Sequence, residues 1–418
     1  MNEPPSSAAT SPEKDEMDLE YSAEHEAFRG RVQEFLKGWP LTGAESKLPM
    51  EEQEAIFRKR GIEAGFVYRS VPKAYGGSEQ PRDAIADRII QEEFYKVGAP
   101  RDLLTQGAGM LVPTLLEFGT EAQKERYIPP ALTGEERWCQ GYSEPGSGSD
   151  LASLQCQARL DGDEWVLNGQ KIWTSSAQRA HMMFGLFRTE PDAKKHDGIS
   201  YLLVPMDRPG IEVRPLKEMA GGHEFNEVFF TDARIPAGNI VGQRGQGWQV
   251  SRATLVHERN LIGNPFMMRE AFSDLLALAR SRTRDGRPAI EDPGIRRRLA
   301  EIEGYVQTCE LSNMRQFTAA NRGEMLKVMR PMMMNKVFST DTMQRIARCA
   351  YDLLEGDGML APLEEELDKW GRTASPTGWV LQYMFSLGPA IAGGATNIQL
   401  NIIGERGYGL PRDLRRTS

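Results

Sequence analysis

The sequence predicts an α+β fold in which an N-terminal helical domain, a central β barrel and a C-terminal helical bundle follow one another. Three observations carry this prediction. The chain has 418 residues, which is too long for a single hydrophobic core. Apolar residues recur at helical spacing towards both ends, and short strand-like segments separated by turn residues lie between them. We expect a disordered tail over residues 1–20 and domains over residues 21–135, 136–243 and 244–418.

The N-terminal part has helical periodicity after a polar start. The opening MNEPPSSAATSPEKDE is rich in Pro, Ser and Glu and has no apolar period, which is typical of a disordered segment. In SAEHEAFRGRVQEFLKGW, the side chains of Phe28, Val32 and Phe35 fall on one stripe of a helix. The segment PTLLEFGTEAQKERYIPPALTGE predicts the end of one helix, a second helix capped by Thr120 and a stop at the two prolines.

The central part has the pattern of short strands. ARLDGDEWVLNGQKIWTSS alternates apolar and polar residues around two predicted turns, Asp161-Gly162 and Asn168-Gly169. MMFGLFR, ISYLLVPM, IEVRPLK and NEVFFTDARIP are four further strand candidates, with Gly, Pro or Asp between them. This density of short strands predicts a small barrel.

Helical periodicity returns after GQRGQGW. Long amphipathic segments fill Trp248 to Arg282, Pro293 to Gln316 and Met325 to Leu354, and a last segment begins near Thr396. RTRDGRP and EGDGMLAP separate these helices. The methionines of MLKVMRPMMMNKVF suit either an irregular core or a malleable pocket.

Composition and charge argue against several classes of function. A formal net charge of −8 is unlike that of a nucleic-acid binder, which would carry a basic face. The five histidines form no HxxxH or HExxH pattern, so we expect no metal site. No apolar run reaches the ~18 residues of a membrane span, and the N-terminus has no apolar signal segment. With four cysteines and no CxxC pair, we expect reduced thiols and a cytoplasmic location.

Three motifs resemble those of the acyl-CoA dehydrogenase family and occur in the family's order. WCQGYSEPGSGSDLASLQCQA is similar to its Thr/Ser-Glu-Pro-x-x-Gly-Ser-Asp signature, and LNGQKIWTSSA is similar to its Asn-Gly-x-Lys-x-Trp strand. GGHEFNEVFFTDARIPAGNIVGQRGQGW is similar to the strand that leads into the C-terminal domain. The resemblance extends from about Tyr21 to Arg412. It implies a C-terminal four-helix bundle, FAD bound between the β domain and that bundle, and an acyl-CoA substrate.

The resemblance also implies which residues of the first motif hold FAD. Small residues in a loop let backbone N–H groups and hydroxyl donors approach a flavin and a pyrophosphate. In the family this loop contacts the flavin ring and the phosphates, and Ser149 would also lie near the acyl thioester. Taken alone, the same string is a surface turn. The implied FAD contacts are Gln140, Tyr142, Ser143, Gly148 and Ser149.

The second motif supplies Trp173, Thr174 and Ser175. By the resemblance, Trp173 lies against the isoalloxazine with Thr174 beside it, and the Ser175 hydroxyl lies near flavin N5. A donor at N5 would stabilise the charge that develops there when N5 accepts a hydride. Taken alone, the segment is a β strand with a core tryptophan.

The resemblance implies further FAD contacts in the C-terminal domain. Arg282 stands where a family arginine reaches the FAD phosphates of a neighbouring subunit, a role that suits the rigid guanidinium. The alternative is a solvated basic turn, because Asp285 departs from the aromatic residue that is common there. Gly356 belongs to the counterpart of the family's Gly-Gly-x-Gly turn. The remaining implied contacts are Gly394, Thr396 and Asn397.

The catalytic base has two possible positions. In many members it is a glutamate before a Gly-Thr pair, and in AGGATNIQ its place is taken by Gly393, whose backbone N–H would bind the thioester carbonyl. A second branch of the family carries the glutamate on a C-terminal-domain helix, in a Glu-Arg pair that matches Glu258-Arg259. Leu255, Glu258 and Ile262 share one helix face. We therefore expect Glu258 to be the base, with Arg259 at the substrate. The alternative is a glutamate in a surface ion network.

The implied reaction is the α,β-dehydrogenation of an acyl-CoA thioester. Glu258 would remove the α proton, and the β hydrogen would pass as hydride to flavin N5. The family passes its electrons to an electron-transferring flavoprotein and shares FAD sites between subunits, which implies a tetramer or dimer, homo- or hetero-oligomeric. Two other hypotheses stay open: a flavin-dependent monooxygenase on the same fold, and a non-catalytic subunit of a hetero-oligomer, which the missing glutamate at Gly393 invites.

Overall fold

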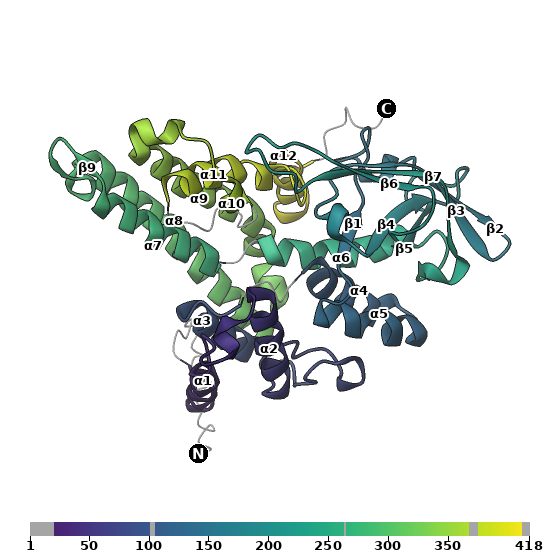
Figure 1. Ribbon diagram of the computed structural model, residues 1–418, viewed down its shortest axis with the longest axis horizontal. Helices are drawn as coiled ribbons and strands as arrows, with labels where there is room; N and C mark the ends of the chain where they lie inside the picture. The colour runs from purple at the N-terminus through teal and green to yellow at the C-terminus, as the bar shows by residue number, and fades with distance from the viewer. Residues whose placement is uncertain (1–20, 101–104, 263–264, 368–374, 412–418) are drawn as a thin grey trace, which may run out of the picture.

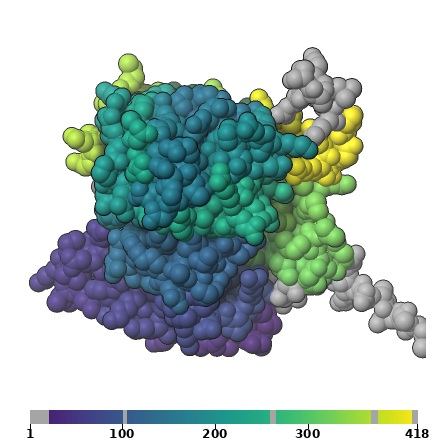
Figure 2. Space-filling model, turned by 90° about the vertical axis from the view of Figure 1, so that its right-hand side faces the viewer, coloured from purple at the N-terminus to yellow at the C-terminus, as the bar shows by residue number. Residues whose placement is uncertain are grey.

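The computed structural model describes residues 21–100, 105–262, 265–367 and 375–411. A helical domain, a β domain and a second helical domain follow one another along the chain (Figure 1). Figure 2 shows the β domain resting on the N-terminal helices, with C-terminal residues to one side. Within the described residues, no helix is long and apolar enough to cross a lipid bilayer.

The N-terminal domain buries one face of its first helix. The predicted stripe is confirmed, because Phe28 and Val32 are buried and Phe35 packs against the same core. Ile89 of the third helix meets this stripe. The helices are α1 (Ala23–Leu36), α2 (Met50–Glu63), α3 (Ala84–Lys96), α4 (Val112–Phe118) and α5 (Glu121–Thr133).

Helix α5 begins as predicted but does not stop where predicted. Thr120 caps it in a capping box with Gln123. The helix then continues through Pro129–Pro130 and ends only at Gly134, which has φ +83°. Prolines remove backbone donors from a helix, but Ile128 and Leu132 are buried in the core beneath the β domain. Tertiary packing therefore overrides the local stop signal.

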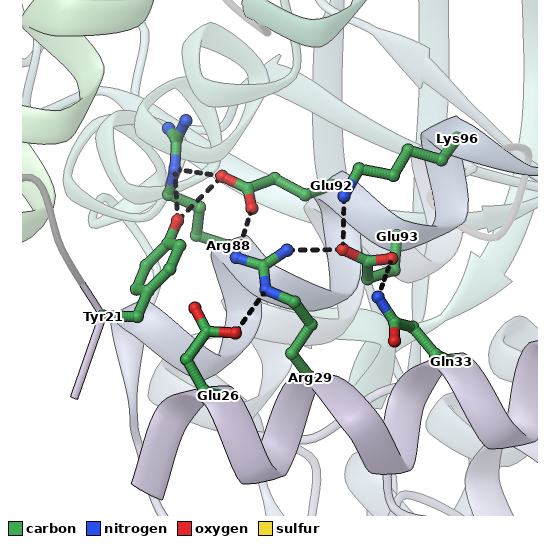
Figure 3. A network of polar contacts seen from close by, with 8 residues as sticks. All are labelled: Tyr21, Glu26, Arg29, Gln33, Arg88, Glu92, Glu93 and Lys96. Carbon is green, nitrogen blue, oxygen red and sulfur yellow. Dashed lines mark hydrogen bonds and ion pairs between the residues drawn. The ribbon is translucent and has the colours of Figure 1, made fainter. Parts of the chain in front are cut away.

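A network of ion pairs joins α1 to α3 (Figure 3), and a hydrogen bond from Arg88 extends it to the C-terminal domain. Arg29 of α1 pairs with Glu92 and Glu93 of α3. Arg88, which is 6% exposed, pairs with Glu92 and donates to Asn313 Oδ1 at 2.9 Å. Asn313 lies on helix α8 (Pro293–Asn321), so Arg88 connects the two helical domains.

The central strands form one eight-stranded sheet with the order β6-β7-β3-β2-β4-β5-β8, and β1 pairs with β4 in parallel. The four strand candidates from MMFGLFR to NEVFFTDARIP and the 157–171 hairpin are confirmed. The strands are β1 (Trp138–Gly141), β2 (Gln157–Asp161), β3 (Glu164–Lys171), β4 (Met182–Arg188), β5 (Ile199–Pro205), β6 (Ile211–Pro215), β7 (Asn226–Pro236) and β8 (Ile240–Val241).

Asn168-Gly169 is not the turn that was predicted. It lies inside β3, where the pairing with β7 shifts between Leu167 and Gly169. Gly169 has φ +136°, and a Cβ there would lie 2.8 Å from Cys156 Cα. The Asn168 amide bonds the side chain and backbone N–H of Asp232 across the strands. The Asn-Gly pair is therefore a β-bulge, for which a local turn signal is easily mistaken.

Strands β4 and β5 are buried on both faces. Met183 and Phe187 point into a core enclosed by the other strands, whereas Phe184 and Leu186 point to a second core shared with α4, α5 and the helix after β8. That helix is α6 (Gly247–Ile262), and Figure 1 shows it running between the sheet and α4. Apolar packing thus fixes α6 against the β domain.

The amphipathic segment expected from Trp248 to Arg282 is helical over α6 (Gly247–Ile262) and α7 (Pro265–Ser281), and residues 263–264 lie outside the described residues. Helix α11 was not predicted, and α12 begins at the predicted Thr396. Besides α6 and α8 the elements are α7 (Pro265–Ser281), β9 (Thr283–Arg284), β10 (Arg287–Pro288), α9 (Met329–Leu354), α10 (Glu364–Leu367), α11 (Pro376–Ser386) and α12 (Thr396–Ile402).

Candidate active site

Glu258 lies on the buried face of α6. Four residues before it, Thr254 is fully buried and its hydroxyl lies 2.9 Å from the Thr114 hydroxyl of α4. Residues four apart share a helix face, so Glu258 follows Thr254 into the junction between the domains. The side chain of Glu258 is half-buried, and its Oε2 atom is shielded from solvent.

The carboxylate lies beside a group of buried hydroxyls. Burial above all raises the pKa of Tyr142 far above its usual range, and the neighbouring Tyr201 and the charge of Glu258 raise it further. Burial likewise raises the pKa of Tyr201. Both tyrosines are therefore neutral at any working pH. They provide a polar but uncharged wall next to Glu258.

A buried lysine of α9 is bonded to the turn before α12. Lys336 of α9 is 3% exposed, and its Nζ donates to the carbonyl of Gly394 at 2.8 Å. Burial lowers the pKa of Lys336, and the negative charge of Glu258 acts in the opposite direction. Lys336 is therefore bonded to the turn before α12, and its pKa responds to the charge of Glu258 on α6.

The turn itself depends on two glycines. Gly393 has φ +60° and Gly394 has φ +92°, a region that side chains with a Cβ rarely adopt. A Cβ on Gly394 would lie 2.3 Å from Gln399 Nε2. Among the described residues, none accepts a hydrogen bond from the Gly393 or Gly394 N–H. The turn therefore offers two backbone donors beside the carbonyl that accepts from Lys336.

We predict that Gly394→Ala lowers the stability of the C-terminal domain by about 1–2 kcal/mol, the usual cost of a left-handed alanine, and slows flavin reduction. The matched control is Gly43→Ala, because Gly43 also has positive φ (+65°) but has no atom within 4 Å of the added Cβ. Thermal unfolding followed by circular dichroism measures both variants. An equal loss in the two variants would show that contact with Gln399 adds nothing.

A buried ion pair ties the first two motifs together. Lys171 is fully buried and its Nζ lies 2.7 Å from Glu144 Oε1. Glu144 also accepts hydrogen bonds from the N–H groups of Gln155 and Cys156, and Lys171 donates to the carbonyl of Tyr142. Both charged groups are thus bonded to partners, and these bonds hold the SEPGSGSD loop against the QKIW strand.

Trp173 is exposed in a strained conformation next to buried polar atoms. Its side chain is 60% exposed, its φ is +59°, and its ring touches only the edge of Phe225 among the described aromatic rings. The adjacent Thr174 has a buried Oγ1, and Gln140 of β1 has a buried Nε2, each without a hydrogen-bond partner in the described protein. Unpartnered buried donors beside an uncovered aromatic ring fit a planar group that bears hydrogen-bonding atoms, such as a flavin.

The other predicted residues are distributed as follows. Ser143 and Ser175 are half-buried, Gly148 and Ser149 lie on the exposed part of the first loop, and Thr396 and Asn397 open α12. Thr396 Oγ1 donates to the Ala390 carbonyl at 3.1 Å. The side chain of Arg259 lies outside the described residues.

Arg282 and Gly356 lie away from this site within one chain. Arg282 donates to Asp357 Oδ2 at 2.6 Å, beside Gly356. Both lie next to the β9–β10 hairpin, which lies at the opposite side of the molecule from the sheet (Figure 1). They are therefore not in contact with the Trp173 region of their own chain.

Comparison with known proteins identifies the fold family. Sequence models of the N-terminal, middle and C-terminal domains of acyl-CoA dehydrogenases match residues 22–135, 139–233 and 245–408. The chain belongs to the acyl-CoA dehydrogenase family. Acyl-CoA dehydrogenases are oxidoreductases that act on CH–CH bonds and typically depend on FAD.

Two relatives and two solved structures illustrate the similarity. This acyl-CoA dehydrogenase is 39% identical over 407 residues to acyl-CoA dehydrogenase IpdE1 of Mycobacterium tuberculosis, covering 93% of this chain and 99% of that protein. It is 31% identical to FadE29 of the same organism over 86% and 88% of the two chains. A protein described as the Tcur3481-Tcur3483 steroid ACAD superposes with a TM-score of 0.76 at 28% identity, covering 95% and 100% of the chains. The structure of the ChsE4-ChsE5 complex from Mycobacterium tuberculosis superposes with a TM-score of 0.75 at 27% identity, covering 95% of this chain and 100% of that chain.

The sequence motifs did not point to Lys336 or Thr254. Lys336 lies in the methionine-rich stretch, where Met329, Met332 and Met334 are each 40% exposed. The available signal was a lysine that falls among the buried positions of α9, as Ser339 does. No group of His, Cys, Asp and Glu in the described part of the chain is arranged to hold a metal ion.

Proposed function

We propose that this acyl-CoA dehydrogenase catalyses the α,β-dehydrogenation of an acyl-CoA thioester with Glu258 as the base. The observation that supports the proposal is that Glu258 has a solvent-shielded Oε2 on α6, while the Gly393–Gly394 turn, held by Lys336, has two backbone N–H groups without an acceptor among the described residues. The proposed site combines this carboxylate with these donors. Removing a proton next to a thioester requires both, a base for the proton and donors for the oxygen that becomes negative.

In this reaction the ionised Glu258 carboxylate accepts the α proton. The N–H of Gly393 donates to the thioester oxygen, where enolate-like charge develops. The neutral Tyr142 and the buried Thr254 keep water away from the carboxylate, so that these interactions act in a low dielectric. When bound, FAD supplies the acceptor for the β hydrogen and its electron pair.

We assign the flavin site to the residues around Trp173. The Nε2 of Gln140 and the Oγ1 of Thr174 are free to bond a flavin, and the exposed face of Trp173 is free to cover one. Ser175 would donate to flavin N5. The remaining contacts that we propose in the same chain are Tyr142, Ser143, Gly148, Ser149, Gly394, Thr396 and Asn397.

We propose that the FAD site is completed by a second subunit. Arg282 and Gly356 lie beside the β9–β10 hairpin, away from the sheet of their own chain (Figure 1), which supports a contact across a subunit interface. The ChsE4-ChsE5 similarity supports a hetero-oligomer as one possibility. An electron-transferring flavoprotein is the electron acceptor we propose. Native mass spectrometry of the protein, expressed alone and together with a second member of the family, distinguishes a homo-oligomer from a hetero-oligomer.

We propose a bulky, ring-bearing acyl group as the substrate. Support comes from the similarity to a protein described as a steroid ACAD. Anaerobic bleaching of the bound flavin by short, branched, long and steroid-derived acyl-CoAs tests this, and we expect the steroid-derived thioester to give the highest kcat/KM. Bleaching by straight chains alone would contradict the substrate class. Failure of every thioester, with oxygen-dependent hydroxylation by the reduced flavin, would instead favour a monooxygenase.

A further inference from the structure

Four hydroxyl groups are buried where the sheet, α4 and α6 meet. Tyr142 follows β1, Tyr201 lies on β5, Thr114 lies on α4 and Thr254 lies on α6, which runs between the sheet and α4 (Figure 1). Tyr142 is 5% exposed, and the other three residues are fully buried. The two tyrosine rings belong to one apolar core. Polar atoms in such a core need hydrogen-bond partners, because burial removes them from solvent.

The two threonine hydroxyls have partners. Thr114 Oγ1 donates to the Met110 carbonyl at 2.8 Å and lies 2.9 Å from Thr254 Oγ1. Thr254 Oγ1 also lies 3.3 Å from the Val250 carbonyl. A hydroxyl has one proton and two lone pairs, and a carbonyl only accepts, so at most one lone pair on Thr254 Oγ1 is used. The Thr254 oxygen can therefore accept one more hydrogen bond.

The two tyrosine hydroxyls have no hydrogen-bond partner among the described residues. The centroids of their rings lie 6.3 Å apart, with the ring planes at 82°. Burial is the main reason that the pKa of each tyrosine is raised, and the nearby Thr254 hydroxyl lowers the pKa of both. The three hydroxyls are therefore neighbours, although neither tyrosine bonds Thr254 directly. Polar groups held just beyond direct contact are commonly bridged by water.

We propose that Tyr142, Tyr201 and Thr254 bind one internal water molecule. The water accepts a hydrogen bond from each of the two phenolic O–H groups and donates one of its protons to the Thr254 oxygen. These are three hydrogen bonds, about the number that a buried water usually makes. The water thus provides the partners that both tyrosine hydroxyls lack in the protein, and it uses the lone pair that Thr254 has left.

The water joins parts of the protein that are far apart in the sequence. It links Tyr201 of β5 to Thr254 of α6, and the contact between Thr254 and Thr114 extends this link to α4. Glu258 follows Thr254 by about one turn of the same helix, so the site fixes the part of α6 that precedes the proposed base. One bound water with three partners differs from bulk solvent, so the carboxylate stays shielded. The site requires only the hydroxyls and does not rest on the proposed function.

The direct test is a crystal structure of the FAD-loaded enzyme, with any subunit that purifies with it, at a resolution that shows ordered water. Crystals with and without a bound acyl-CoA are compared. We expect one water peak within hydrogen-bonding distance of Tyr142 Oη, Tyr201 Oη and Thr254 Oγ1 in both. A direct bond between two of these hydroxyls, or no peak between them, overturns the inference. An acyl-group oxygen at this place, seen only with acyl-CoA, also overturns it.

Tyr201→Phe tests the site in solution, because it removes the hydroxyl and keeps the ring that stacks on Phe184. The hydrogen bond to the water is lost, so we expect the thermal unfolding midpoint of the holoenzyme to fall by about 1–3 °C. Removing a hydroxyl that has no partner would leave the midpoint unchanged or raise it, and that result overturns the inference. Tyr408→Phe is the matched control, because Tyr408 is 56% exposed and its hydroxyl is accessible to solvent. Its midpoint should stay at the wild-type value.

A double variant tests whether the two tyrosines share one water. Tyr142→Phe and Tyr201→Phe are measured singly and together by the same thermal unfolding. If the water is shared, the first substitution already loosens it, so the double variant should lose less than the sum of the two single losses. Losses that add would indicate two independent partners and overturn the shared water. If a variant does not fold, the crystal structure of the unaltered enzyme still decides.

Discussion

Glu258→Gln reduces the rate of flavin reduction by acyl-CoA by about 10³-fold, within the 10²–10⁴-fold range usual for a general base. Glutamine has the shape of glutamate but cannot accept the α proton at neutral pH. Since the substitution changes neither the Gly393–Gly394 turn nor the Trp173 region, FAD content and acyl-CoA affinity should stay close to those of the wild type. Anaerobic stopped-flow absorbance of the flavin measures the rate directly.

The matched control for this substitution is Glu117→Gln. Glu117 is an exposed carboxylate on α4 that acts on His257, the residue next to Glu258. The flavin of the Glu117→Gln variant should be reduced at the wild-type rate. If Glu258→Gln does the same, the α proton is removed by another group and the assignment of the base is wrong.

Lys171→Met lowers the free energy of unfolding by about 3–5 kcal/mol, the usual result of breaking a buried pair by removing one partner. Glu144 stays 8% exposed and loses its cation, and the SEPGSGSD loop loses its tie to the QKIW strand. Because both segments border the proposed flavin site, FAD content should fall as well. Urea unfolding followed by tryptophan fluorescence, together with the flavin-to-protein absorbance ratio, measures both effects.

Lys195→Met is the control for this prediction. Lys195 pairs with Asp150 on the surface of the same domain, with side-chain exposures of 49% and 61%. Exposed pairs contribute only about 0–1 kcal/mol, so the control should unfold close to the wild-type urea concentration. Similar losses in the two variants would contradict a structural role for the buried pair.

Local patterns were sufficient to predict the order of the domains and most strands. MMFGLFR and ISYLLVPM are confirmed as β4 and β5 because turn residues bound each run, and Thr120 begins α5 because its side chain can bond Gln123. Local signals failed where tertiary packing decided the outcome. Core burial of Ile128 and Leu132 carries α5 through two prolines, and pairing with β7 turns Asn168-Gly169 into a bulge.

The candidate site could be predicted only where it coincides with a motif. Glu258 and Gly393 were found because a carboxylate and a glycine stand at two alternative positions of one family pattern. Lys336 could not be found in this way, since its bond to Gly394 joins residues 58 positions apart, and no spacing rule relates α9 to the turn before α12. Contacts of this kind become visible only when the helices are packed together.

The central claim is that Glu258 removes the α proton. It is tested most directly by the exchange of that proton with D₂O in an acyl-CoA analogue that lacks a transferable β hydrogen, bound to the FAD-loaded enzyme. We predict that the wild-type enzyme exchanges the α proton and that Glu258→Gln, with the same flavin content, does not. Exchange at the wild-type rate in Glu258→Gln would contradict the assignment of the base to helix α6.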